Sequence, residues 1–158
     1  MTTIGHEATK SRSVVIVQIV LRVFVSSWLI LTSVVAQTPP PPRTVDKGDF
    51  SNVDDAKQVV VRTEAEWKTL WRQHGGERPM PAVDFGKDIV LGVFMGSRPT
   101  AGFDIAITST IEANGILHVR YRERMPARGM VLAQVLTFPF HLVAVPKTAS
   151  EVKFEKES

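Results

Sequence analysis

The chain has 158 residues, of which 44% are hydrophobic, and it contains no cysteine. This length predicts one domain with its own core, and the composition excludes disulfides, a thiolate zinc site and a thiol nucleophile within the chain. The net charge of +3 depends on residues 1–36, which hold three of the 19 basic and one of the 16 acidic residues. The remaining residues are nearly neutral, so the basic character does not predict nucleic-acid binding.

Residues 1–36 are predicted to be a cleaved signal peptide. A basic, polar lead precedes an apolar segment, which ends in small residues at Ala36, as signal peptidase requires. The alternative is a retained anchor, because Val14–Val35 approaches the ~20 residues that cross a bilayer. Arg22 argues against it, since a cation at the centre of a span costs about 2.5–3.5 kcal/mol. We therefore expect a secreted or periplasmic protein, with membrane anchoring as the alternative.

Residues 37–55 are predicted to be a disordered, proline-rich linker. Pro39–Pro42 favours an extended spacer, and the charged residues that follow show no apolar periodicity. A proline-rich ligand for another domain is the alternative interpretation. The domain itself is expected over residues 56–155, and its first strand is predicted at Lys57–Arg62.

A helix is predicted directly after this strand. Thr63 and Glu66 fit a capping box, and Gly75-Gly76 marks the end of the helix. Trp67 and Trp71 fall on one helical stripe, which we interpret as core against a sheet and not as a ligand platform. His74, on the last turn, is expected to contact the final helix carbonyls.

The stretch DIVLGVFMGSRPTAGF, residues 88–103, predicts a strand, a rigid loop and a returning strand. Its first half is an almost unbroken apolar run, which is typical of a strand that is covered on both faces. Asn114-Gly115 predicts a tight hairpin between strands at Phe103–Ile111 and Ile116–Arg124. Further strands are predicted at Met130–Thr137 and Phe140–Val145.

The strand at residues 116–124 places apolar residues on one face and a basic stripe on the other. The stripe consists of His118, Arg120, Arg122 and Arg124. We interpret it as a solvated, ion-paired face, with an anionic partner as the alternative. Val152 and Phe154 predict a short edge strand. The resulting fold class is α+β and predominantly antiparallel, with one amphipathic helix on a five- to seven-stranded sheet, as a sandwich or a partly open barrel.

No motif in the sequence specifies a reaction. The chain lacks HExxH, GxSxG, GxGxxG and P-loop patterns, and His74, His118 and His141 are widely separated. We therefore predict no catalytic residues, no metal site and no cofactor, and we expect a protein that is not an enzyme.

Two segments resemble a known family. RPTAGF (residues 98–103) and QVLTFPFHLVAVPK (residues 134–147), in their order along the chain, resemble the C-terminal domain of the protease complex subunit PrcB family of secreted bacterial proteins. The resemblance covers about residues 59–147. It implies an accessory or stabilising role for a partner protease, without catalysis. Ala101 and Phe103 depart from the glycine and tyrosine usual in the family.

RPTAGF is also similar to the central loop of chagasin-type cysteine protease inhibitors. Ala127-Arg128-Gly129 is comparable to the second loop of those inhibitors, but the third has no counterpart. Inhibition of a cysteine protease is therefore the second functional hypothesis, and an envelope structural or interaction domain is the third.

Both resemblances lead to the same candidate surface. A protein partner, expected to be a secreted protease, would contact two loops that proline and glycine make rigid before binding. If the loops lie at the same end of the sheet, they form one joint surface. The candidate residues are Arg98, Pro99, Thr100, Ala101, Gly102, Phe103, Met125, Pro126, Ala127, Arg128 and Gly129.

Overall fold

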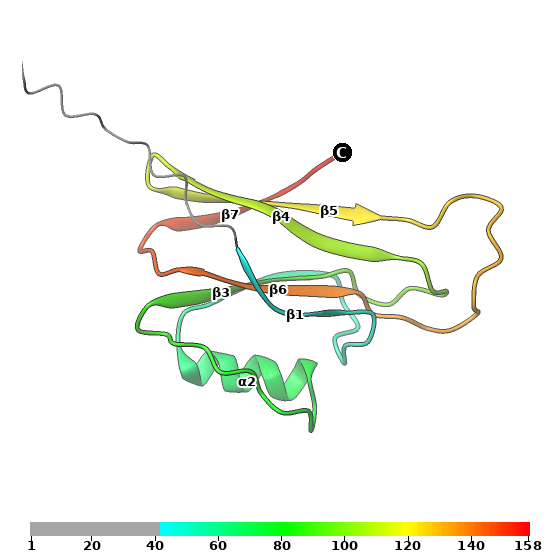
Figure 1. Ribbon diagram of the computed structural model, residues 1–158, viewed down its shortest axis with the longest axis horizontal. Helices are drawn as coiled ribbons and strands as arrows, with labels where there is room; N and C mark the ends of the chain where they lie inside the picture. Colours follow the sequence, from blue (N-terminus) through cyan, green and yellow to red (C-terminus); the bar gives the residue numbers. More distant parts are fainter. Residues whose placement is uncertain (1–41) are drawn as a thin grey trace, which may run out of the picture. The chain divides into compact units, whose positions relative to one another are not determined.

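The computed structural model describes residues 42–158, which contain two β-sheets and one helix (Figure 1). The first sheet has the strand order β1-β6-β3-β2 and the second has the order β4-β5-β7. In chain order the elements are β1 (Arg43–Gly48), β2 (Lys57–Val61), α2 (Glu64–His74), β3 (Asp88–Phe94), β4 (Asp104–Ala113), β5 (Ile116–Arg124), β6 (Phe140–Pro146) and β7 (Glu151–Lys156).

Strands β3 and β6 lie at the centre of the first sheet and are covered on both faces. In β3, alternate residues such as Leu91 pack between the two sheets, whereas Val90 and Phe94 pack toward α2. Residues 89–94 are all buried, which confirms the prediction from the apolar run. The described part of the chain therefore has three layers, with α2, the first sheet and the second sheet in that order (Figure 1).

The second sheet is built on the predicted hairpin. Asn114 and Gly115 both have positive φ, as a tight two-residue turn requires, and β4 pairs antiparallel with β5. Strand β7, at the position predicted for the edge strand, runs parallel to β5. The fold is thus mostly antiparallel, and the strands of the described residues form two open sheets without closing a barrel.

Helix α2 begins and ends where the sequence predicts. The Thr63 side chain accepts a hydrogen bond from the Glu66 backbone, and the Glu66 side chain accepts one from the Thr63 backbone. Trp67 and Trp71 are buried against the first sheet. Their indole N–H groups donate to backbone carbonyls of the loop that follows α2. Both tryptophans are therefore part of the core, as expected.

The structure corrects the prediction of a linker over residues 37–55. Residues 43–48 form β1, which pairs with β6, and both Ser51 and Val53 are buried. Strand β1 was missed because it carries a single apolar side chain, Val45, and is held mainly by its backbone pairing. Residues 37–41, like the predicted signal peptide or anchor, lie outside the described residues. Among residues 42–158, no helix is long and apolar enough to cross a membrane.

The structure also corrects the strand predicted at Met130–Thr137. This segment has no strand, and its regular pairing is limited to a bridge between Thr137 and Arg98. The physical reason lies in its neighbour, residues 97–102. Pro99 cannot donate to a ladder, and Gly102 has a φ of 92°, so this loop offers no regular edge to pair with.

Candidate functional site

The two candidate loops lie at the same end of the sheets. Loop 97–103 follows β3 and loop 125–129 follows β5 (Figure 1). They meet at Gly102, where a Cβ atom would lie 3.1 Å from Pro126 Cβ and 3.3 Å from Leu132 Cδ2. The condition for a joint surface is thus met, and the loops adjoin at a position where glycine allows both the positive φ and the close approach.

Hydrogen bonds hold loop 97–103 between two other segments. Arg98 and Thr137 exchange two backbone hydrogen bonds of 2.8 and 2.9 Å, and the Thr137 hydroxyl donates to Thr100 O at 3.0 Å. On the other side, Ser97 N donates to Asp54 O at 2.9 Å. These four hydrogen bonds hold the loop in place within the domain, and a loop that is already ordered loses less entropy in any binding event.

The side chains of the candidate residues differ in how far they are available. Pro99, Gly102 and the tip residues of loop 125–129 are exposed, whereas Arg98, Thr100 and Phe103 are half-buried. Phe103 packs against the core between the sheets, and the Arg98 guanidinium lies 5.9 Å from the centre of its ring. Phe103 therefore supports the loop and presents only part of its ring to solvent.

Sequence reasoning missed four apolar side chains at this end. The sequence predicts an apolar strand over residues 130–137, but Met130 (60% exposed), Val131 (fully exposed), Val135 (40%) and Leu136 (55%) face solvent, as does Met125 (71%). We call these five residues the apolar loop set. The signal that could have indicated exposure is weak: the segment contains Gln134 and does not alternate between apolar and polar residues.

A second cluster of polar groups lies on the other side of the first sheet. The buried Ser51 Oγ lies 2.8 Å from His74 Nδ1, and His74 Nε2 lies 3.2 Å from Asp46 Oδ2. Val53 N–H donates to Ser51 Oγ, and Arg78 Nη2 lies 3.1 Å from His74 Nε2. Arg78 completes the chain by binding the same Asp46 oxygen at 3.1 Å.

These contacts correct the prediction for His74, which binds Ser51 and Asp46 instead of the last helix carbonyls. The reason is its position on the buried stripe of α2, which turns the ring toward Phe94 and Phe140. Burial lowers the pKa of His74, because the hydrogen bond and charge of Asp46, which favour the imidazolium, do not offset the loss of hydration.

The order serine, histidine, aspartate resembles that of a hydrolase triad, but the surroundings do not suit a nucleophile. A nucleophile must reach the substrate carbon. Ser51 is only 6% exposed, and the His74 ring is enclosed by Trp71, Phe94 and Phe140. The chemistry available to this cluster is therefore structural: it connects β1 and the loop after it to α2.

The other two histidines of residues 42–158, His118 and His141, also bind groups within the domain. His141 Nδ1 accepts from Ile107 N at 2.9 Å, and its Nε2 lies 3.0 Å from Thr44 Oγ1, so His141 connects both sheets. Burial lowers its pKa, and the nearby Lys47 acts in the same direction. His118 Nδ1 lies 2.9 Å from Glu155 Oε1. Within residues 42–158, no group of three or more histidine, aspartate or glutamate side chains could hold a metal ion.

The basic stripe of β5 lies beside acidic residues of the C-terminal segment. Arg122 lies 2.9 Å from Glu157, and Arg120 lies 3.9 Å from Glu155. The hydrogen bond from His118 is the main cause of the lowered pKa of Glu155. These pairs support the interpretation of an ion-paired, solvated face.

Together, the fold and these loops define a helix-covered, two-sheet β domain with an exposed loop surface at one end. A family model described as PrcB C-terminal matches residues 89–146, from the first buried residue of β3 to the end of β6. This match confirms the resemblance seen in the sequence. No curated protein and no solved structure matches the chain.

Proposed function

We propose that this chain is a secreted, non-catalytic accessory domain that binds a partner protease through one end of its sheets. The family match over residues 89–146 supports an association with a protease complex. The matched region contains both candidate loops and the whole apolar loop set, so the similarity and the candidate surface lie in the same part of the chain.

One observation supports the proposed protein-binding role most directly. Five large apolar side chains over residues 125–136 are exposed, and this segment is joined to loop 97–103 by a hydrogen bond of 3.1 Å from Ala101 N to Ala133 O. Exposed apolar side chains that gather in one segment are typical of protein interaction sites. Methionine adds adaptability, because its unbranched side chain can fit an irregular partner surface.

Inhibition of a cysteine protease is the second candidate function. It is favoured by the contact of loop 97–103 with loop 125–129 at Gly102 and Pro126, since such inhibitors act through adjacent loops. The half-buried Phe103 is less favourable, because its ring is largely committed to the core.

The two roles are separated by measuring protease activity in the presence of the protein. The purified chain is used to capture proteins from the secreted and whole-cell fractions of its source, and captured proteases are assayed with and without it.

In a second experiment, the purified chain is incubated with papain-like and subtilisin-like proteases. The proposal predicts a captured protease whose activity is unchanged or increased. Tight inhibition of a papain-like protease would contradict it and favour the inhibitor. Capture of no protease would also contradict it.

A further inference from the structure

The outer edge of β2 differs from the other three sheet edges in the described residues. Strand β1 has a register shift between Thr44 and Asp46, and β4 has one between Ile107 and Ser109. Such bulges discourage pairing with another strand. Strand β7 carries charged residues along its length, which has the same effect. Strand β2 pairs in regular register with β3 and ends in three consecutive valines, Val59–Val61.

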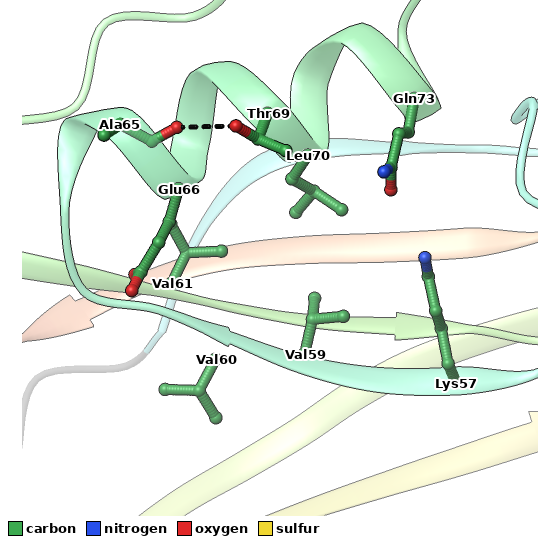
Figure 2. Close-up of a pocket in the computed structure, with 9 residues that line it drawn as sticks. All are labelled: Lys57, Val59, Val60, Val61, Ala65, Glu66, Thr69, Leu70 and Gln73. Atoms are coloured by element: carbon green, nitrogen blue, oxygen red, sulfur yellow. Dashed lines mark hydrogen bonds between the residues drawn. The ribbon is translucent and has the colours of Figure 1, made fainter.

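An open groove runs beside this edge. It has a volume of about 440 Å³ and lies between β2 and α2 (Figure 2). Val59, Val61 and Leu70 form its apolar floor, while Thr69 and Gln73 line its helix side. An additional strand at the β2 edge would therefore find backbone groups to pair with and an apolar groove for alternate side chains.

Two charged residues stand at opposite ends of the groove (Figure 2). Lys57 is the first residue of β2, and its Nζ lies 5.7 Å from the centre of the Phe94 ring. The Glu66 carboxylate lies at the other end, where its Oε2 accepts from Arg62 N at 2.7 Å. Glu66 Oε1 has no hydrogen bond among the described residues, so it can accept from a group that approaches the edge.

This arrangement is complementary to itself. When two antiparallel copies of β2 pair about a two-fold axis at Val59, all five residues have partners and Lys57 stands opposite Val61. Because the Glu66 carboxylate lies at the residue after Val61, each Lys57 then faces the Glu66 of the other copy. A two-fold interface repeats every contact, so a single favourable charge pair occurs twice.

We infer that β2 is a self-association edge, at which a second copy of this chain pairs antiparallel and extends the first sheet across the interface. Both copies of α2 then lie on the same face of the joined sheet, and their two grooves meet over the paired valines. Loop 97–103 follows the end of β3 that lies beside Lys57. The two-fold axis therefore directs the loop surfaces of the two copies toward opposite ends and leaves both uncovered.

The test is the molar mass of the mature chain, which begins at Gln37 after the predicted signal peptide, measured by sedimentation equilibrium over a wide concentration range. The wild type is expected to show a monomer–dimer equilibrium. Lys57→Glu should raise the dimer Kd by about tenfold or more, because two attractive contacts become repulsive. Glu66→Gln should raise Kd less, because it removes the attraction to Lys57 without adding a repulsion. Glutamine still accepts the capping hydrogen bonds, so the start of α2 is preserved. Lys153→Glu, which makes the same charge change on β7, is the matched control and should leave Kd unchanged.

Two results would overturn the inference. A wild-type chain that remains monomeric at all concentrations would show that the β2 edge does not pair with itself. A dimer with the same Kd in Lys57→Glu and Lys153→Glu would place the interface elsewhere. Neither result bears on protease binding, because the loop surface lies away from the proposed interface.

Discussion

His74 shows, at the scale of one residue, how burial decides the role of a titratable group. Its lowered pKa, caused chiefly by burial, means that the folded protein binds a proton there less readily than the unfolded chain does. Below the unfolded pKa of about 6.5, unfolding therefore takes up a proton, and protonation favours the unfolded state. His141, whose pKa is also lowered by burial, acts in the same direction.

We predict that the free energy of unfolding falls as the pH is lowered from 7.5 to 5.5. The slope approaches about 1.4 kcal/mol per pH unit for each histidine that takes up a proton on unfolding. Urea denaturation at a series of pH values measures it. In His74→Gln only the contribution of His141 should remain, so the slope should be smaller. A free energy of unfolding that is constant over this range would contradict the account of both histidines.

Gly96 tests the packing of residues 54–56 on the end of β3. It has a φ of 75°, and a Cβ atom there would lie 2.7 Å from Ala56 N and 2.8 Å from Asp54 O. We predict that Gly96→Ala lowers the free energy of unfolding by about 3 kcal/mol or more, because the left-handed conformation costs 1–2 kcal/mol and the backbone clash adds to it.

The matched control for this substitution is Gly115→Ala. Gly115 has nearly the same φ, 76°, but no atom lies within 4 Å of the position of its Cβ. It should therefore show the conformational cost alone, about 1–2 kcal/mol. Equal losses in the two variants, measured by chemical denaturation, would show that residues 54–56 do not pack on Gly96.

At the scale of one element, α2 depends on its cap as well as on its buried stripe. Thr63→Ala removes the side-chain acceptor for Glu66 N and should lower the free energy of unfolding by about 1 kcal/mol. Thr69→Ala is the comparison, because Thr69 is exposed within the same helix and alanine has the higher helix propensity. Thermal unfolding followed by circular dichroism should show a clear loss for the first variant only.

The elements that the sequence predicted well are those whose pattern is set locally. The apolar run of β3, the capping box of α2 and the Asn114-Gly115 turn each specify their structure without reference to distant residues. The two wrong predictions, a linker over residues 37–55 and a strand over residues 130–137, concern segments whose structure depends on distant partners. Strand β1 has little apolar pattern and exists because β6 pairs with it. Residues 130–137 have the composition of a strand but lie beside a loop that cannot form a ladder.

The candidate site was predictable only in part, for the same reason. Proline and glycine marked both loops, yet their contact at Gly102 and Pro126 depends on how β3, β4 and β5 are arranged. The exposure of Val131 and Leu136 could not be read from composition, since apolar residues are usually interpreted as core. The hydrogen-bonded chain from Ser51 through His74 to Asp46 was missed because its members come from three different segments.

At the scale of the whole molecule, the proposed interaction surfaces are separated by role. We propose that one end presents the apolar loop set to a partner protease and that the β2 edge presents a regular strand to a second copy. The remaining edges of the described sheets carry bulges or charges. A dimer with two uncovered loop ends would bind two partner molecules. Disrupting the dimer with Lys57→Glu should therefore lower the number of partner molecules per assembly from two to one, without weakening the affinity of each loop surface for its partner.

Site-specific photocrosslinking can show whether the loop end of the domain contacts a protease, as proposed. A photoreactive phenylalanine analogue is placed at Val131, and in a control at Ile111, which is also exposed (47%) but lies beside the hairpin turn at the far end of β4. Both proteins are exposed to the secreted and whole-cell fractions of the source and irradiated. We predict a crosslinked protease from position 131 and none from position 111. Equal labelling at both positions, or no protease at position 131, would contradict it.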